Sequence, residues 1–130
     1  MKAVIERVVS SVPDALRFYR DELGFSVEVR EDGAHGQPEW ARLELSGLRL
    51  SLKDAATFRA ELPAFAETPL GGTTMLCLEV ADLAAWRARL GDRVRIIDPV
   101  HRTPCGSQQF AFLDPDGYPI VIEQPSGTGG

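Results

Sequence analysis

One sequence pattern occurs twice in this chain, and it limits the possible fold more than any other feature. The pattern is a short apolar strand, a capped helix with an apolar stripe, a glycine and a further strand. In the first half the strand is 5–9, residues 10–14 open the helix, and Gly24 ends it before a strand at 25–29. Serine, proline and aspartate suit a first helical turn, and glycine suits a helix end. The apolar stripe of this helix consists of Leu16, Tyr19 and Leu23.

The second half repeats the pattern with a shorter helix. Its first strand is 76–80, Asp82 is the expected helix cap, Gly91 the expected end, and 94–97 the next strand. This helix is shorter than the first by about one turn. Two copies of one structural unit are therefore predicted. The stripe of the second helix consists of Leu83, Trp86 and Leu90.

Each copy continues with two more strands that a tight turn joins. Ser46-Gly47 separates strands 39–45 and 48–53, and the turn 114–117 separates strands 109–113 and 119–123. Asp114 and Asp116 are interpreted as turn residues, with Gly117 supplying the positive φ that the turn needs. The order is strand, helix and three strands, twice. It predicts an α+β fold of two tandem βαβββ modules.

The chain is expected to form a single domain over residues 1–130. Its parts are module 1 at about 3–53, a connector at 54–72 with one helical turn around 57–62, module 2 at about 73–124, and a tail at 125–130. A content of 44% hydrophobic and 25% charged residues is that of a globular protein.

Charge and cysteine content exclude several classes of partner. The formal net charge is −5, which disfavours nucleic acid and anionic membranes, because both attract clusters of Lys and Arg. No apolar run is long enough to span a membrane, and Glu6 and Arg7 interrupt any signal-peptide core. We expect a cytoplasmic protein in which Cys77 and Cys105 are reduced, Cys77 being packed in the interior.

Two motifs resemble those of a known superfamily. Phe18-Tyr19 followed by residues 23–25 resembles the "FY…LGF" signature of the vicinal oxygen chelate superfamily, which includes glyoxalases, bleomycin-resistance proteins and extradiol dioxygenases. Residues 104–106 followed by 110–117 resemble its C-terminal signature "pWG…FxFxDPDG", with Cys105 in place of the tryptophan. The resemblance covers residues 4–124.

The resemblance implies a particular architecture and a range of functions. Each module is expected to form a curved mixed sheet with its helix on the convex side, and the concave faces to enclose a cleft, commonly shared between the subunits of a dimer. The superfamily includes metal-dependent lyases, epimerases and ring-cleaving dioxygenases. It also includes metal-free proteins that sequester antibiotics.

The positions that correspond to the family's metal ligands predict that no metal and no cofactor is bound. Alignment on the motifs places these positions at Val4, Ser51, Met75 and Val121, of which valine donates nothing and methionine sulfur is soft. Both histidines, His35 and His101, are expected in loops rather than on strands. A site made only of carboxylates, from Glu6, Glu79 and Glu123, is the alternative.

Strand alternation predicts which side chains line the cleft. Leu43, Leu45, Leu50 and Leu52 should pack under the helix, and the intervening residues should face the concave side. Those of module 1 are Trp40, Arg42, Glu44, Arg49, Ser51 and Lys53; those of module 2 are Met75, Cys77, Glu79, Val121 and Glu123.

Each candidate has a structural alternative. Trp40 is expected either to stack on a planar ligand or to pack in the core or a dimer interface. Arg42 and Arg49 could bind a carboxylate or pair with Glu44 or Glu79. Met75 could be a pocket wall or core. His101 could be a general base or a solvated loop residue. No residue is assigned as catalytic, and the predicted ligand-binding set is Trp40, Arg42, Arg49, Ser51, Met75, Val121 and Glu123.

Three functions are compatible with this sequence. The first is a homodimeric, metal-independent protein that binds a small organic molecule, cationic or aromatic, and sequesters it. The second is a lyase, isomerase or dioxygenase-like enzyme of the same fold with a non-standard or absent metal site. The third is a regulatory or assembly module.

Overall fold

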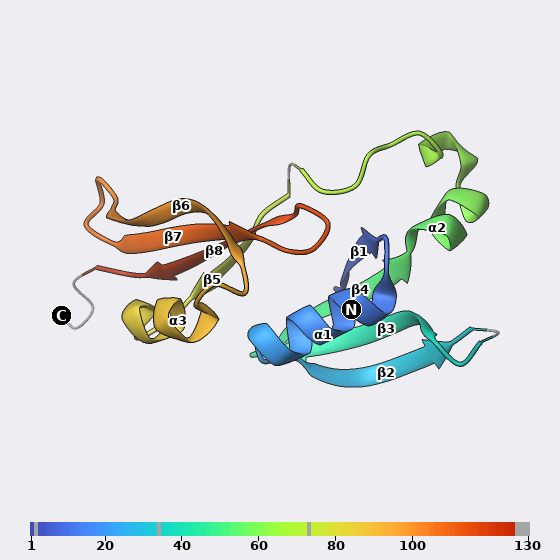
Figure 1. Ribbon diagram of the computed structural model, residues 1–130, viewed down its shortest axis with the longest axis horizontal. Helices are drawn as coiled ribbons and strands as arrows, with labels where there is room; N and C mark the ends of the chain where they lie inside the picture. The colour runs from blue at the N-terminus through green and yellow to red at the C-terminus, as the bar shows by residue number, and fades with distance from the viewer. Residues whose placement is uncertain (2, 34, 73, 127–130) are drawn as a thin grey trace. The chain divides into compact units, whose positions relative to one another are not determined.

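The computed structural model describes residues 1, 3–33, 35–72 and 74–126, which form two compact units (Figure 1). The first unit is Met1–Leu70 and the second begins at Gly71. Each unit contains one four-stranded mixed sheet, and the two sheets have the same topology. This confirms the predicted α+β fold of two tandem modules.

The first unit contains β1 to β4. The strands β1 (Ile5–Val9), β2 (Ser26–Asp32), β3 (Pro38–Leu45) and β4 (Leu48–Asp54) form a sheet in the order β1-β4-β3-β2. β1 runs parallel to β4, and the other neighbours are antiparallel. The connector forms α2 (Ala55–Glu61) and a 3₁₀ turn (Pro63–Phe65), so its helical part begins earlier than predicted.

The first helical segment follows the predicted pattern. It comprises α1 (Val12–Arg17) and a π-helical continuation (Phe18–Glu22). Ser11 caps it, because the Ser11 Oγ accepts a hydrogen bond from the Asp14 backbone N–H at 3.2 Å. Gly24 follows the helix end with a φ of +88°. The predicted stripe of Leu16, Tyr19 and Leu23 is buried.

The hairpin of β3 and β4 separates an apolar face from a polar one. Its turn, Ser46-Gly47, has a positive φ at both residues, as a tight two-residue hairpin requires. α1 contacts both strands. Leu43, Leu50 and Leu52 are buried, as predicted, while Leu45 at the end of the strand is only half-buried.

The second unit repeats this arrangement. The strands β5 (Leu76–Glu79), β6 (Arg95–Arg102), β7 (Gln108–Leu113) and β8 (Pro119–Gln124) form a sheet in the order β5-β8-β7-β6, with β5 parallel to β8. The helix is α3 (Leu83–Leu90), which is shorter than the first helical segment, as predicted.

The core of the second unit lies between α3 and the central strands. Phe110 and Phe112 on β7, and Ile120 and Ile122 on β8, are fully buried. Asp82 caps α3 by accepting a hydrogen bond from the Ala85 backbone N–H at 3.1 Å. Leu83 and Leu90 of the predicted stripe are buried, whereas Trp86 is half-buried.

The turn between β7 and β8 is organised by Asp114. This buried carboxylate accepts hydrogen bonds from the backbone N–H groups of Asp116 at 2.8 Å and Tyr118 at 2.9 Å. Gly117 has a φ of +88°. The interpretation of this segment as a turn is therefore confirmed.

Three local predictions were wrong. β2 shows no alternation, because it is an edge strand with two register shifts and all seven of its residues are exposed. β6 continues beyond Ile97 to Arg102, so His101 lies on a strand and not in a loop. Pro99 is tolerated there because β6 is an edge strand. Cys77 is exposed rather than packed.

No helix of the described residues has both the length and the hydropathy needed to cross a membrane.

Candidate functional site

Six polar or aromatic side chains occupy the face of the first sheet opposite its buried leucines, which we call the open face. They form three cross-strand pairs in the β3–β4 register. This is the face that strand alternation predicted. The pairs are Trp40 with Lys53, Arg42 with Ser51, and Glu44 with Arg49.

Trp40 is held in place by two polar neighbours. Its indole Nε1–H donates a hydrogen bond to Glu6 Oε1 at 3.0 Å, which joins β3 to the edge strand β1. The guanidinium carbon of Arg42 lies 5.2 Å from the centroid of the Trp40 ring. Trp40 is half-buried, so part of the ring remains available for contact.

Both arginines of the open face already have polar partners. Arg42 Nε donates to Ser51 Oγ at 3.2 Å, and Ser51 is buried. Arg49 Nε lies 3.3 Å from Glu28 Oε1. The predicted pairing of these arginines with Glu44 or Glu79 was wrong. The bulge of β2 brings Glu28 to Arg49. Glu44 instead accepts a hydrogen bond from the Gly47 backbone N–H.

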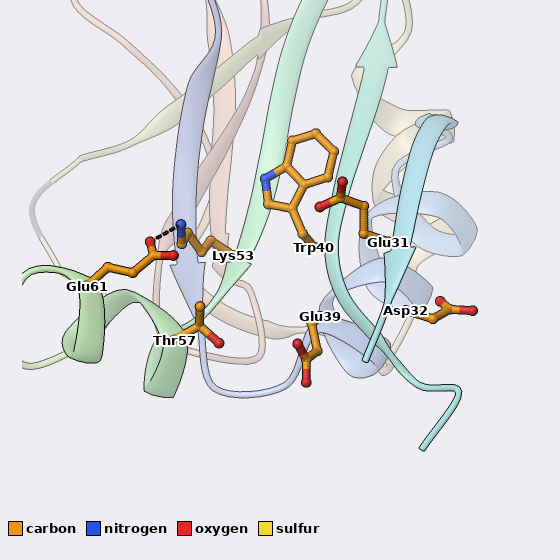
Figure 2. Close-up of a pocket in the computed structure, with 7 residues that line it drawn as sticks. All are labelled: Glu31, Asp32, Glu39, Trp40, Lys53, Thr57 and Glu61. Atoms are coloured by element: carbon orange, nitrogen blue, oxygen red, sulfur yellow. Dashed lines mark hydrogen bonds and ion pairs between the residues drawn. The ribbon is translucent and has the colours of Figure 1, made fainter. Parts of the chain in front are cut away.

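A hollow lies at one end of the open face, between the ends of β2 and β3 and the helix α2 (Figure 2). Its volume is about 520 Å³. Trp40 and Lys53 form its floor, and Figure 2 shows Glu61 of α2 on one side and Glu31 of β2 on the other. We call it the Trp40 hollow; it is lined by Glu31, Asp32, Glu39, Trp40, Lys53, Thr57 and Glu61.

Lys53 supplies a fixed positive charge to this hollow. Its ammonium donates a hydrogen bond to Glu61, and this bond raises the pKa of Lys53 above its ordinary value. Desolvation opposes the shift, and the negative charges of Glu61 and Glu6 add to it. Lys53 therefore stays protonated across the physiological pH range.

The predicted site residues of the second unit form a less polar surface. Met75 precedes β5 and is 58% exposed, so it is not part of the core. Val121 pairs with Cys77 and with Ala111. Glu123 Oε2 accepts a hydrogen bond from Ser107 Oγ at 2.9 Å.

His101 has a defined environment on β6. Its Nδ1 lies 2.9 Å from the Pro99 carbonyl oxygen and 3.6 Å from Asp98 Oδ2. Because a carbonyl oxygen can only accept, this contact requires the proton on Nδ1, which leaves Nε2 as the basic nitrogen of the neutral ring. His35 lies in the turn between β2 and β3.

The side chains at the four family metal positions do not suit a divalent ion. The buried Ser51 hydroxyl faces the guanidinium of Arg42, which would repel a second cation. Val4 and Val121 offer hydrocarbon, and Met75 offers a thioether. Within the described residues no three His, Cys, Asp or Glu side chains group as metal ligands.

Two of the three glutamates of the carboxylate alternative already have hydrogen-bond partners. Glu79 and Glu123 are register partners on β5 and β8, and Glu123 is hydrogen-bonded to Ser107. Glu6 belongs to the first unit and accepts the indole hydrogen bond of Trp40.

The family of this protein follows from comparison with known proteins. The model of the Glyoxalase/Bleomycin resistance protein/Dioxygenase superfamily matches residues 3–122. The chain therefore belongs to this superfamily, as its two motifs predicted. No protein of curated function matches the sequence.

Solved structures share the fold over nearly the whole chain. An antibiotic-binding protein, TnmS3 from Streptomyces sp. CB03234, is 30% identical, with a TM-score of 0.69 and coverage of 97% of this chain and 98% of that one. A protein of unknown function from Agrobacterium tumefaciens strain C58 is 24% identical, with a TM-score of 0.76 and coverage of 95% and 94%. A lactoylglutathione lyase from Agrobacterium tumefaciens is 20% identical, with a TM-score of 0.69 and coverage of 99% and 98%. The last two show the fold alone.

The candidate site includes residues that the predicted ligand-binding set lacks. Glu6 fixes Trp40, and Glu31, Thr57 and Glu61 line the Trp40 hollow. Two signals were available: the acidic run at residues 31–32, and Asp54 as a cap for a helix that follows β4 directly. Neither signal predicts that β2 and α2 flank the same end of the open face.

Proposed function

We propose that this protein binds a small organic molecule without a metal ion and sequesters it, acting as a cytoplasmic homodimer. Its mechanism is retention: stacking and charge pairing lower the free concentration of the compound, and no bond is made or broken. TnmS3, the antibiotic-binding protein at 30% identity, supports this class of function.

The observation that carries the proposal is the contact between Arg42 and Ser51. At the position of a family metal ligand this chain has Ser51. The buried Ser51 hydroxyl oxygen accepts a hydrogen bond from the Arg42 guanidinium. The same guanidinium lies over the Trp40 ring, and Glu6 fixes the indole from the other strand. Aromatic side chains that a ligand packs against, together with a few placed polar groups that fix its orientation, are typical of small-molecule pockets.

Metal analysis and ligand screening test the proposal together. Protein purified from cells supplied with zinc, nickel, iron and manganese is expected to contain well below one equivalent of any of them by elemental analysis. In a thermal-shift screen of antibiotics and aromatic metabolites, a ligand at ~100 times its Kd should add ~2.7 kcal/mol, which is a shift of roughly 10 °C. A stoichiometric metal, or no shift with any compound, would contradict the proposal.

A second candidate function, a metal-independent lyase or isomerase, is favoured by one observation. His101 lies on β6 with Nδ1 at the Pro99 carbonyl, so that Nε2 is available as a general base. Under the sequestration proposal we expect no formation or breakdown of lactoylglutathione above background. Turnover would favour the enzyme instead if the His101→Asn variant loses it and the exposed-surface variant Val100→Ala keeps it.

A further inference from the structure

We propose that the Trp40 hollow binds an organic cation in which an amidinium, guanidinium or ammonium group is attached to a planar ring. The inference rests on the proposed function, because it assigns the ligand's chemical class and places its charged end. The hollow belongs to the first unit alone, since all the residues that line it lie between Glu31 and Glu61.

The hollow has the size of a small-molecule site. Its volume of about 520 Å³ falls within the roughly 300–1,000 Å³ that ligand pockets usually have. Three separate elements wall it: the β2–β3 end, β4 and α2. α2 is placed by Asp54, whose carboxylate accepts a hydrogen bond from the Thr57 backbone N–H at 3.1 Å.

The charge of the hollow favours a cation. Four carboxylates line it against the single ammonium of Lys53. Asp32 is compensated by Arg30 at 2.6 Å, and Glu61 is compensated by Lys53. Among the described residues, Glu31 and Glu39 form no ion pair, so the hollow carries two uncompensated negative charges at neutral pH.

Trp40 supplies the aromatic surface between these carboxylates. Glu31 is its register partner on β2, and Figure 2 shows the Glu31 carboxylate beside the indole. Trp40 is half-buried, so part of the ring is open to stacking by a planar cation. The Arg42 guanidinium also lies over the ring at 5.2 Å, so Glu31 and Glu39 must outweigh its repulsion of a ligand cation. A planar cation can therefore combine ring stacking with charge pairing, which neither a neutral nor an anionic analogue can do.

The second uncompensated carboxylate lies against a glycine. A Cβ at position 33 would lie 2.1 Å from Glu39 Oε1, so a side chain there would displace the Glu39 carboxylate from the position it has in this structure.

Three probes of matched shape test the inference: benzamidinium, benzamide and benzoate. Binding to the full chain is followed by ¹⁵N–¹H spectra during titration. Benzamidinium is expected to bind about fivefold more tightly than benzamide, as one or two exposed charge pairs allow, and benzoate more weakly still. The largest shifts should fall on the amides of the residues that line the hollow. Equal affinity for the cation and the neutral amide, or shifts elsewhere, would overturn it.

Charge-removing variants locate the effect. Glu31→Gln and Glu39→Gln should each weaken benzamidinium binding about twofold and leave benzamide unchanged. Glu67→Gln is the matched control, since it removes one exposed carboxylate from the connector of the same unit. If Glu67→Gln weakens binding as much as the other two, the attraction comes from net charge and the inference fails.

The two proposals fail in different ways. Suppose that the protein holds no metal and is stabilised by neutral or anionic compounds but does not prefer benzamidinium. The proposed function then stands, and the proposed cation site is wrong. A stoichiometric metal contradicts the proposed function whatever the order of the three probes.

Discussion

Replacing Phe110 with alanine is expected to lower the free energy of unfolding by about 3–5 kcal/mol, the range for truncating a large buried aromatic side chain. Phe110 is fully buried at the centre of β7, opposite Ile122 on β8. Its ring stacks on Phe112 with centroids 5.9 Å apart. Truncation therefore removes both buried area and the contacts that fill the space beneath α3.

Urea denaturation provides the measurement. Phe110→Leu should cost less than half as much as Phe110→Ala, because most of the volume is kept. Val100→Ala is the control on the same unit; Val100 is 43% exposed, and its truncation should change stability by no more than about 0.5 kcal/mol. A loss for Phe110→Ala no larger than that of Val100→Ala would contradict the core described above.

The same substitution tests the proposal that the chain folds as a single domain. Each unit contains one tryptophan, Trp40 in the first and Trp86 in the second. In variants that keep only Trp40 or only Trp86, the fluorescence of the remaining tryptophan reports the unfolding of its own unit. Phe110→Ala should lower the urea midpoint of both unfolding transitions by the same amount. A shift confined to the Trp86 signal would mean that the units unfold independently.

The parts of the fold that the sequence predicted are those that short-range patterns determine. Leu16, Tyr19 and Leu23 lie within two helical turns, and one capping residue opens each helix, so local periodicity was sufficient. The hairpin turns were predicted for the same reason, since Ser46-Gly47 carries its own conformational requirement. Repetition of the pattern then predicted two modules with the same order of elements, which the structure confirms.

The errors lie where position in the sheet overrides local pattern. The apolar residues of β2 alternate in sequence, yet as an edge strand with register shifts it buries neither face. The strand at 94–97 was expected to end before His101, but β6 continues through Pro99, because the outer edge of β6 needs no donor at that position.

Local sequence patterns could not predict the contacts of the candidate site either. The Trp40 indole bonds Glu6, 34 positions away in the chain. That contact depends on the parallel pairing of β1 with β4, next to β3, and no short segment encodes it. Arg49 likewise meets Glu28 because of a bulge in β2 rather than through a cross-strand position that alternation could predict.

Replacing Trp40 with alanine is expected to weaken binding of the ligand by about 30-fold, which corresponds to ~2 kcal/mol for the loss of a central aromatic contact. The indole is the one aromatic side chain that lines the hollow among the described residues. Its removal also releases Glu6 and Arg42, which hold the ring at present. The measurement is isothermal titration calorimetry with the compound that gives the largest thermal shift.

Trp86→Ala is the matched control for this prediction. Trp86 also has a guanidinium over its ring, that of Arg89 at 4.2 Å, but it lies on α3 of the second unit. Trp40→Phe should recover part of the affinity, because a smaller ring still stacks but cannot donate to Glu6. If Trp86→Ala weakens binding and Trp40→Ala does not, the ligand does not use the open face. The contact between Arg42 and Ser51 would then explain only why a metal is excluded there, and not how a ligand is held.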